Sequence, residues 1–199
     1  MQHQYMTMPR ERKPKFQFPW RRANRFELLV DGQAYFPRML DAIRTAQRYV
    51  LLEIYLLESG SVADRFIEAL SAVAARGVQV KLLVDAFGAA KLVAEDRLRL
   101  RASGVEFQFY NPLRLRKWLG NMFRDHRKLL IVDGELAFVS GTGITDDFDN
   151  PREPARSWRE TTLQISGPVL TDWLELVVRS WYRQAQEKLS GPAPVMRRE

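Results

Sequence analysis

The feature that most constrains the fold is the regular alternation of apolar runs with amphipathic ones over residues 26–110. The apolar runs have the length of strands and read "FELLVDG", "YVLLEIYLL", "VQVKLLVD" and "VEFQFY". Between them, "YFPRMLDAIRTAQR", "VADRFIEALSAVAARG" and "AAKLVAEDRLRLRAS" carry apolar residues at helical spacing. Because parallel neighbouring strands need a crossover helix between them, this alternation predicts an α/β fold with parallel pairing.

The pattern changes after residue 110. A basic, aromatic loop, "NPLRLRKWLGNMFRD", is followed by two strands that Asp133-Gly134 joins as a hairpin. An acidic, proline-bearing loop, the strand "ETTLQIS" and a long closing helix that begins near Pro168 come next. We predict a basic, aromatic arm over residues 1–24, one domain over 25–189 and a linker-like tail over 190–199.

Composition narrows the classes of function. The chain of 199 residues suits one domain, and it has no cysteine, which excludes disulfides and thiol chemistry and fits a reducing compartment. A net charge of +7 indicates an anionic partner, which is phosphate, nucleic acid or an acidic membrane face. We expect neither a signal peptide nor a membrane-spanning helix. The arm is then a solvated leader, or a strip that lies on anionic lipid.

The stretch "RDHRKLLIVDG" places His126, one of two histidines, two residues before Lys128. The side-chain period of a strand puts both on one face of the sheet. A two-residue hairpin turn would pair Val132 with Glu135, Leu130 with Ala137, Lys128 with Val139 and His126 with Gly141. This register gathers an imidazole, an ammonium and the Ser140-Gly141 backbone at one end of the sheet.

Such a set of groups suits phosphate chemistry. Lys128 can neutralise a phosphate oxygen, and Ser140, Thr142 and backbone N–H groups can donate hydrogen bonds. The imidazole of His126 can attack phosphorus or pass a proton to a leaving oxygen. The sequence shows no cluster of metal-ligating residues, so we expect neither a metal nor another cofactor.

The motif His126-x-Lys128-x4-Asp133-Gly134, followed by Ser140-Gly141, resembles the HKD motif of the phospholipase D superfamily. Flanking segments, among them "ARGVQVKLLVDAFG" and "SWRETTLQISGPVL", resemble successive segments of the same family, and the resemblance covers most of the chain. The Asn-Pro-Leu loop before the motif and Trp-Arg-Glu after it are most similar to the first half of bacterial cardiolipin synthases. The resemblance implies an α-β-α sandwich with a mixed, largely parallel central sheet.

The resemblance also implies roles for individual residues. His126 would be the nucleophile or its acid–base counterpart, Lys128 would hold the phosphate, and Asp133 would be mainly structural. Glu160 stands where the family has an acidic residue that orients the histidine. The substrate-binding residues would be Arg124, Ser140, Gly141 and Thr142.

Two positions raise further expectations. The family usually carries asparagine where this chain has Gly143, and that change removes an amide donor for the phosphate. Glu53 lies inside an apolar strand, where an unpaired charge is costly, so we expect it to have a partner. That partner belongs either to the same site or to a structural ion pair.

The family's chemistry uses two histidines in a ping-pong reaction, whereas this chain carries one motif. A homodimer, a second motif-bearing half, or a remnant that binds without turnover would each account for this. We interpret the chain as a phosphatidyltransferase or phosphodiesterase on anionic phospholipid, cytoplasmic and peripheral on the inner face of the cell membrane. The alternatives are a metal-independent phosphodiesterase on nucleic acid and a catalytically impaired lipid-binding half-domain.

Overall fold

A computed structural model describes residues 18–112, 122, 124–150 and 153–185 of the chain. The elements, in order, are β1 (Arg25–Val30), α1 (Gly32–Thr45), β2 (Tyr49–Ile54), α2 (Ser61–Ala75), β3 (Gln79–Asp85), α3 (Ala94–Ala102), β4 (Glu106–Tyr110), β5 (Lys128–Val132), β6 (Leu136–Ser140), β7 (Thr161–Ser166) and α4 (Leu170–Ala185). Most of the predicted arm, the core of the basic, aromatic loop and the predicted tail lie outside the described residues.

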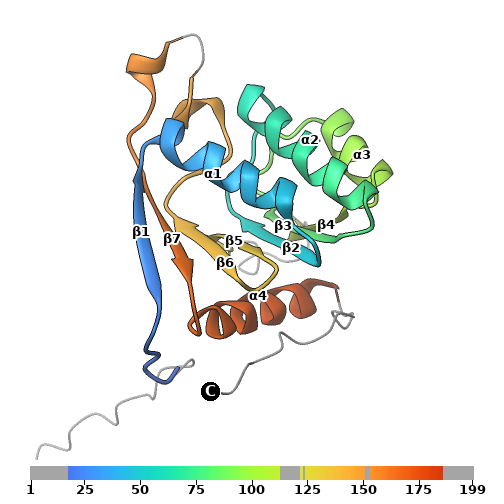
Figure 1. Ribbon diagram of the computed structural model, residues 1–199. Helices are drawn as coiled ribbons and strands as arrows, with labels where there is room; N and C mark the ends of the chain where they lie inside the picture. The colour runs from blue at the N-terminus through green and yellow to red at the C-terminus, as the bar shows by residue number, and fades with distance from the viewer. Residues whose placement is uncertain (1–17, 113–121, 123, 151–152, 186–199) are drawn as a thin grey trace, which may run out of the picture.

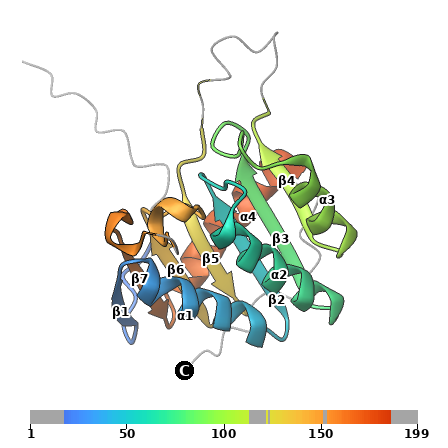
Figure 2. The ribbon, with the colours of Figure 1, turned by 90° about the horizontal axis from the view of Figure 1, so that it is seen from above.

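The strands form a seven-stranded mixed sheet in the order β1-β7-β6-β5-β2-β3-β4, which Figure 2 shows from above. The mixed sheet is confirmed, but the expectation of largely parallel pairing is wrong. Parallel pairing is limited to β2–β3 and β3–β4, whereas β1–β7, β7–β6, β6–β5 and β5–β2 are antiparallel. Two causes are visible: α1 connects β1 to β2 across the width of the sheet, so that β1 pairs with β7 at the far edge, and the hairpin makes β5 and β6 antiparallel.

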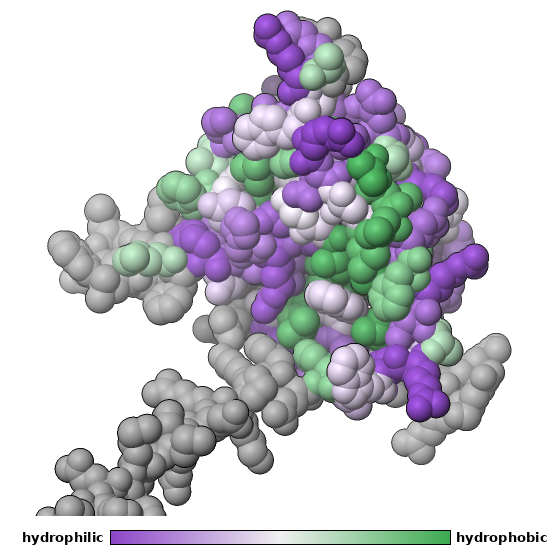
Figure 3. Space-filling view, turned by 90° about the vertical axis from the view of Figure 1, so that its left-hand side faces the viewer, coloured by the Kyte–Doolittle hydropathy of each residue, from purple (hydrophilic) through white to green (hydrophobic). Residues whose placement is uncertain are grey.

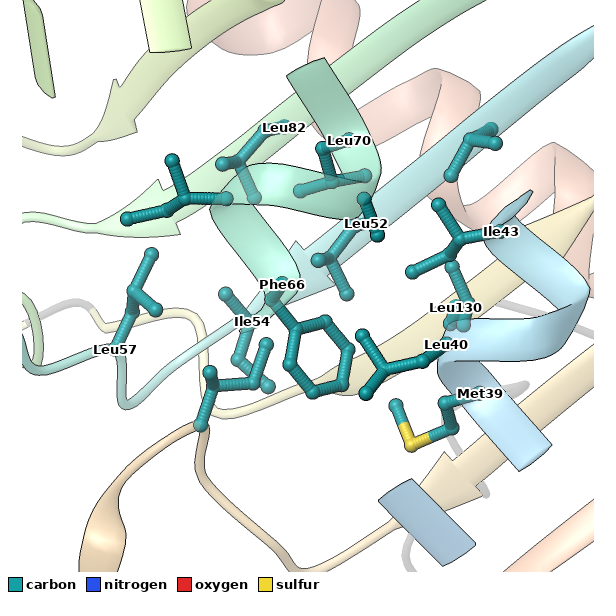
Figure 4. Close-up of a cluster of buried hydrophobic side chains, with 14 of the residues drawn as sticks. Met39, Leu40, Ile43, Leu52, Ile54, Leu57, Phe66, Leu70, Leu82 and Leu130 are labelled. Atoms are coloured by element: carbon teal, nitrogen blue, oxygen red, sulfur yellow. The ribbon is translucent and has the colours of Figure 1, made fainter. Parts of the chain in front are cut away.

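Helices cover both faces of the sheet, which confirms the α-β-α sandwich. In Figure 1, α1, α2 and α3 lie on one face and α4 lies on the other. The sheet must be apolar on both sides to be covered in this way, and every residue of β2 is buried. Figure 4 shows the larger core, in which Met39, Leu40 and Ile43 of α1 and Phe66 and Leu70 of α2 meet β2, β3 and β5. Tyr49, Leu51, Leu129, Ile131, Ile165 and Val177 belong to the smaller core on the α4 face.

Two helices differ from the sequence-based expectation. Helix α1 begins at Gly32 rather than at Tyr35, and α3 is shorter than the predicted segment 89–103. The residues before α3 form turns because the Asp85 carboxylate accepts hydrogen bonds from the N–H groups of Phe87 and Gly88, at 2.9 and 3.2 Å. These local bonds compete with the helical ladder.

The β5–β6 hairpin exists as predicted, but its register differs by one residue. Val132 pairs with Leu136 rather than Glu135, because Asp133-Gly134, at φ 55° and 70°, is followed by Glu135 as an extra residue in the turn. Leu129 therefore pairs with Val139, and the ladder continued by one residue sets Lys128 opposite Ser140. The predicted pairs Leu130–Ala137, Lys128–Val139 and His126–Gly141 are therefore wrong by one residue, and Leu130 pairs with Phe138.

Strand β1 leaves an apolar strip uncovered at the edge of the sheet. Phe26, Leu28 and Val30 point to the α4 face, where their partners in β7 are Ile165, Leu163 and Thr161. All three side chains are exposed. Figure 3 views this side of the molecule and shows apolar surface gathered among hydrophilic groups. Helix α4 thus covers the middle of the sheet and not this edge.

Asp133→Ala tests what holds the hairpin turn against the chain before β2. The Asp133 carboxylate accepts hydrogen bonds from the backbone N–H groups of Gln47, Arg48 and Tyr49, at 2.9, 2.8 and 2.9 Å. Losing these bonds, with alanine at a positive φ, should lower the free energy of unfolding by about 2–4 kcal/mol in urea denaturation. The control Glu135→Ala, an exposed residue of the same turn, should change it by less than about 0.5 kcal/mol. Equal losses in the two variants would contradict this account.

Candidate functional site

His126 and Lys128 lie together where the chain enters β5. Strand β5 begins at Lys128, so His126 stands just before the strand, with its side chain exposed. The Lys128 Nζ lies 3.0 Å from His126 Nδ1, 3.2 Å from Nε2 and 3.1 Å from the His126 backbone oxygen. The ammonium can donate to whichever ring nitrogen is unprotonated. The predicted proximity of the two side chains is therefore confirmed.

The surroundings of this pair tune Lys128. The Lys128 side chain is 8% exposed, and burial lowers its pKa, while the carboxylates of Asp125 and Glu160 act in the opposite direction. The ring of Tyr55, just after β2, lies 4.6 Å from the His126 ring, centroid to centroid, and 5.1 Å from Lys128 Nζ. The imidazole thus has an aromatic wall on one side and a cation at its ring nitrogens.

Glu160 lies beside the same end of the sheet. Its Oε1 accepts a hydrogen bond from the N–H of Thr161, at 2.8 Å. A Cβ added to Gly141 would come within 2.2 Å of Glu160 Oε2, so only glycine at 141 leaves room for the carboxylate in this position. The structure brings Glu160 close enough to act on Lys128. Its role in orienting His126 stays a prediction.

Ser140 and Thr142 occupy different environments. Ser140, the last residue of β6, is partly exposed and lies opposite Lys128 in the continued register. Thr142 is fully buried, and its hydroxyl donates to the Gly143 carbonyl at 2.9 Å. The Tyr35 hydroxyl lies 3.0 Å from Thr142 Oγ1 and is left to donate to it. A direct contact of Thr142 with substrate would require these bonds to be exchanged, and its role in substrate binding stays a prediction.

A buried carboxylate that the sequence reasoning missed anchors the segment before His126. Asp85, the last residue of β3, accepts hydrogen bonds from the Asp125 N–H at 3.0 Å and from Arg124 Nη1 at 3.4 Å. The same carboxylate holds Phe87 and Gly88 of the loop after β3. Arg124 is thereby placed beside the site, and its contact with substrate stays a prediction. The signal was available: an aspartate ends the apolar strand "VQVKLLVD" at its carboxyl end.

Glu53 has the partner that its position requires. It is 1% exposed, and Arg127 Nη1 donates to its Oε1 at 2.9 Å. The same guanidinium also bonds to the Ser180 hydroxyl of α4. Arg127 directly follows His126 in the chain. The pair is therefore a structural ion pair that also adjoins the candidate site, and both expectations hold. Sequence reasoning gave the need for a partner but not its identity.

Gly143 lies where two chain segments run very close together. The Ile144 N–H donates to the Leu56 carbonyl at 2.9 Å, and the Glu58 N–H donates to the Ile144 carbonyl at 3.2 Å. A Cβ at 143 would come within 2.8–2.9 Å of Cβ, Cγ and Cδ2 of Leu56. The space that an asparagine side chain would enter is therefore filled by Leu56.

Metal ligands and membrane spans are both absent from the part of the chain that the structure describes. Within those ranges, no group of three or more histidine, cysteine, aspartate or glutamate side chains could hold a metal ion. No helix among the same residues is long and apolar enough to cross a membrane.

Comparison with known sequences identifies relatives for most of the chain. The family described as "Cardiolipin synthase, PLD-like domain" matches residues 39–175. The chain is 34% identical to cardiolipin synthase A of Pseudomonas fluorescens over 167 residues, which are 82% of this chain and 34% of that protein. It is 33% identical to a cardiolipin synthase of Geobacillus thermodenitrificans over 178 residues, 88% of this chain and 35% of the other. The chain thus spans about a third of the length of these curated relatives.

Solved structures share the fold at low sequence identity. Nuc of Salmonella typhimurium, a phospholipase D family member, superposes with a TM-score of 0.61 at 17% identity and covers 81% of this chain and 96% of its own. A phosphatidylserine synthase of Haemophilus influenzae gives a TM-score of 0.61 at 15% identity, over 87% of this chain and 40% of that one.

Asp85→Ala tests the buried anchor of the site. It leaves the donors of Phe87, Gly88 and Asp125 without their acceptor, which should lower the free energy of unfolding by about 2–4 kcal/mol. Asp41→Ala is the control, because its carboxylate is 71% exposed in a surface pair. That variant should change the unfolding free energy by less than about 0.5 kcal/mol in the same urea titration. A loss for Asp85→Ala as small as for the control would refute the anchoring role.

Gly143→Ala tests the close contact with Leu56. The added methyl group overpacks the site and should lower the free energy of unfolding by about 1–3 kcal/mol. Leu56→Ala removes two of the three close atoms, Cγ and Cδ2. The double variant should therefore depart from additivity by at least about 0.5 kcal/mol, in the direction of relief. Strict additivity of the two single changes would show that the two residues do not compete for space.

Proposed function

The chain belongs to the cardiolipin synthase, phospholipase D-like domain family, and we propose on that premise that it acts on the phosphodiester of an anionic phospholipid. The observation that carries the proposal is the exposed His126 ring with the Lys128 ammonium 3.0 Å from its Nδ1. An exposed imidazole with an adjacent cation suits attack on a negatively charged phosphorus centre.

The proposed reaction proceeds in two displacements. An unprotonated ring nitrogen of His126 attacks phosphorus, a nitrogen–phosphorus bond forms, and the bond from phosphorus to the leaving alcohol breaks. Lys128 neutralises a phosphate oxygen while a second acid protonates the leaving oxygen. An acceptor hydroxyl, or water, then attacks phosphorus, gives its proton to the group that had acted as the acid, and breaks the nitrogen–phosphorus bond to release His126. Transfer of the phosphatidyl group and hydrolysis differ only in this acceptor.

The second acid must come from another motif-bearing half. The remaining histidine, His3, lies outside the described residues, and its sequence context is unlike that of His126. We propose a homodimer, or a partner that carries a second motif, with one histidine contributed by each half.

A lipid substrate is supported by the surface around the site. Phe87 is 58% exposed and Met122 is 76% exposed. Phe87 lies in the loop after β3 and Met122 in the segment before β5, and hydrogen bonds to Asp85 hold both segments beside His126. Apolar side chains next to a basic site suit the boundary between headgroups and acyl chains, and the net charge of +7 favours an anionic surface. We propose peripheral attachment to an anionic membrane, at the cytoplasmic face.

Incubation with phosphatidylglycerol vesicles tests the proposal. The wild-type chain should release glycerol and form cardiolipin or phosphatidic acid, and His126→Ala should reduce the rate by at least about 100-fold because the nucleophile is lost. His3→Ala is the matched control and should retain activity.

Two further measurements test the intermediate and the second half of the site. A radiolabelled phospholipid should leave a His126-dependent phosphoenzyme, and the molecular mass in solution should be that of a dimer.

Other outcomes would select the alternatives. EDTA-resistant nicking of plasmid DNA that His126→Ala abolishes, with inert vesicles, would instead assign a nucleic-acid phosphodiesterase. Vesicle binding that survives His126→Ala, with no turnover by the wild type, would indicate an impaired lipid-binding half-domain.

A further inference from the structure

A second polar cluster lies on the opposite face of the sheet from Lys128, beneath the segment that carries His126. Glu53 is the penultimate residue of β2, and its side chain lies on the face of the sheet that α4 covers. Asp125 precedes His126 and is 7% exposed. Arg127 follows His126 and reaches Glu53 and Ser180. Buried carboxyl groups of this kind need a donor for every oxygen.

Two oxygens of this cluster lack a donor. Glu53 Oε1 is bonded to Arg127 Nη1, and Asp125 Oδ1 accepts the Arg127 backbone N–H at 3.4 Å. Glu53 Oε2 and Asp125 Oδ2 are fully buried, and neither accepts a hydrogen bond from any of the residues that the structure describes. The two carboxyl groups converge on one guanidinium group, since Arg127 Nη1 lies 2.9 Å from Glu53 Oε1 and 3.9 Å from Asp125 Oδ1. Two ionised carboxylates would repel there, whereas one proton would satisfy both oxygens.

The charges around the pair agree with a bound proton. Burial raises the pKa of Glu53 to about 9, and Asp125 adds to the rise, against the lowering effect of Arg127. On β3, Asp85 lies behind the Asp125 N–H. Cations lie near the pair: Arg127 faces both carboxyl groups, Lys81 pairs with Glu106, and Lys128 lies at the His126 ring and interacts electrostatically with Asp125. Helix α4 presents Ser180, which is neutral but whose hydroxyl acts, like Arg127, against the rise in the pKa of Glu53.

We propose that Glu53 Oε2 and Asp125 Oδ2 share one proton, and that this shared proton positions His126. The inference deepens the proposed function and rests on it only for its consequence in catalysis. Asp125 is held on its backbone side by Asp85 and on its side chain by Glu53, so the peptide that leads into His126 is fixed at two points. Glu53 is a positioning residue, since it acts on His126 through Asp125.

Nuclear magnetic resonance of the full chain reads out this arrangement without substrate. The chain has two histidines, so a His3→Gln background labelled with ¹⁵N-histidine leaves His126 as the single labelled residue. Its backbone and ring signals should show an alkaline titration step as Glu53, whose pKa burial raises to about 9, loses its proton. Glu53→Gln should remove that step, because the glutamine Nε2 donates to Asp125 Oδ2 and does not titrate.

Matched variants identify the source of the step. Asp133→Asn changes another carboxylate, one that accepts backbone N–H groups at the hairpin turn, and should leave the step in place. An alkaline step that persists in Glu53→Gln and disappears in Lys128→Met would belong to the lysine and overturn the proposal. A wild-type His126 signal without any alkaline step would overturn it equally.

Stability gives an independent readout with a defined sign. Between the ordinary glutamate pKa of 4.5 and about 9, the folded chain holds a proton that the unfolded chain has lost. The unfolding free energy of the wild type should therefore fall relative to Glu53→Gln as pH rises through this window. A difference between the two that does not change with pH contradicts a shared proton.

Failure of the proposed function is distinguishable from failure of this inference. If the titration step and the stability slope are present but the vesicles stay inert, the lipid reaction is wrong and the shared proton stands. If the vesicles react, the wild type should show a fall in kcat near pH 9 that Glu53→Gln lacks, beyond the loss of the Lys128 proton that both share, with KM equal in the two. Identical pH profiles of kcat would overturn the positioning role.

Discussion

The carboxylate of Asp85 is the contact on which the site depends most. It is buried at the carboxyl end of β3 and would be costly there without donors. Its partners come from the loop after β3 and from the segment before β5, which are separated in the sheet by β2. One side chain therefore connects the parallel part of the sheet to the antiparallel part. The position of His126 follows from this connection, since Asp125 is the last residue held before it.

Sequence periodicity predicted the parts of the fold that depend on local pattern. The strands, the hairpin between β5 and β6, and the proximity of His126 and Lys128 all follow from side-chain alternation and an Asp-Gly turn. The register was predicted wrongly because one further residue, Glu135, joins the turn, and nothing local distinguishes the two cases. The place of β1 was also missed, since pairing with β7 is a contact between the two ends of the domain.

The residues around His126 that sequence reasoning missed share a physical cause. Tyr55, Asp85 and Arg127 act through contacts to segments that are far away in sequence, so no spacing rule reveals them. Glu53 was different, because a carboxylate within an apolar strand indicates by its sequence context alone that it needs a partner. The sequence could thus predict that burying the Glu53 carboxylate is costly. That Arg127 offsets this cost could be known only from the way the strands pair.

Gly143 has a consequence for how such a site changes over time. Leu56 now fills the space beside it, and two backbone hydrogen bonds keep the segments at that distance. A single change to asparagine would meet an occupied position, and shortening Leu56 still leaves its Cβ within 2.9 Å. Gain of the family's amide thus needs the main chain to move as well as the side chains to change. Substitutions that add a phosphate donor at another position therefore need fewer simultaneous changes than the return of an amide at position 143.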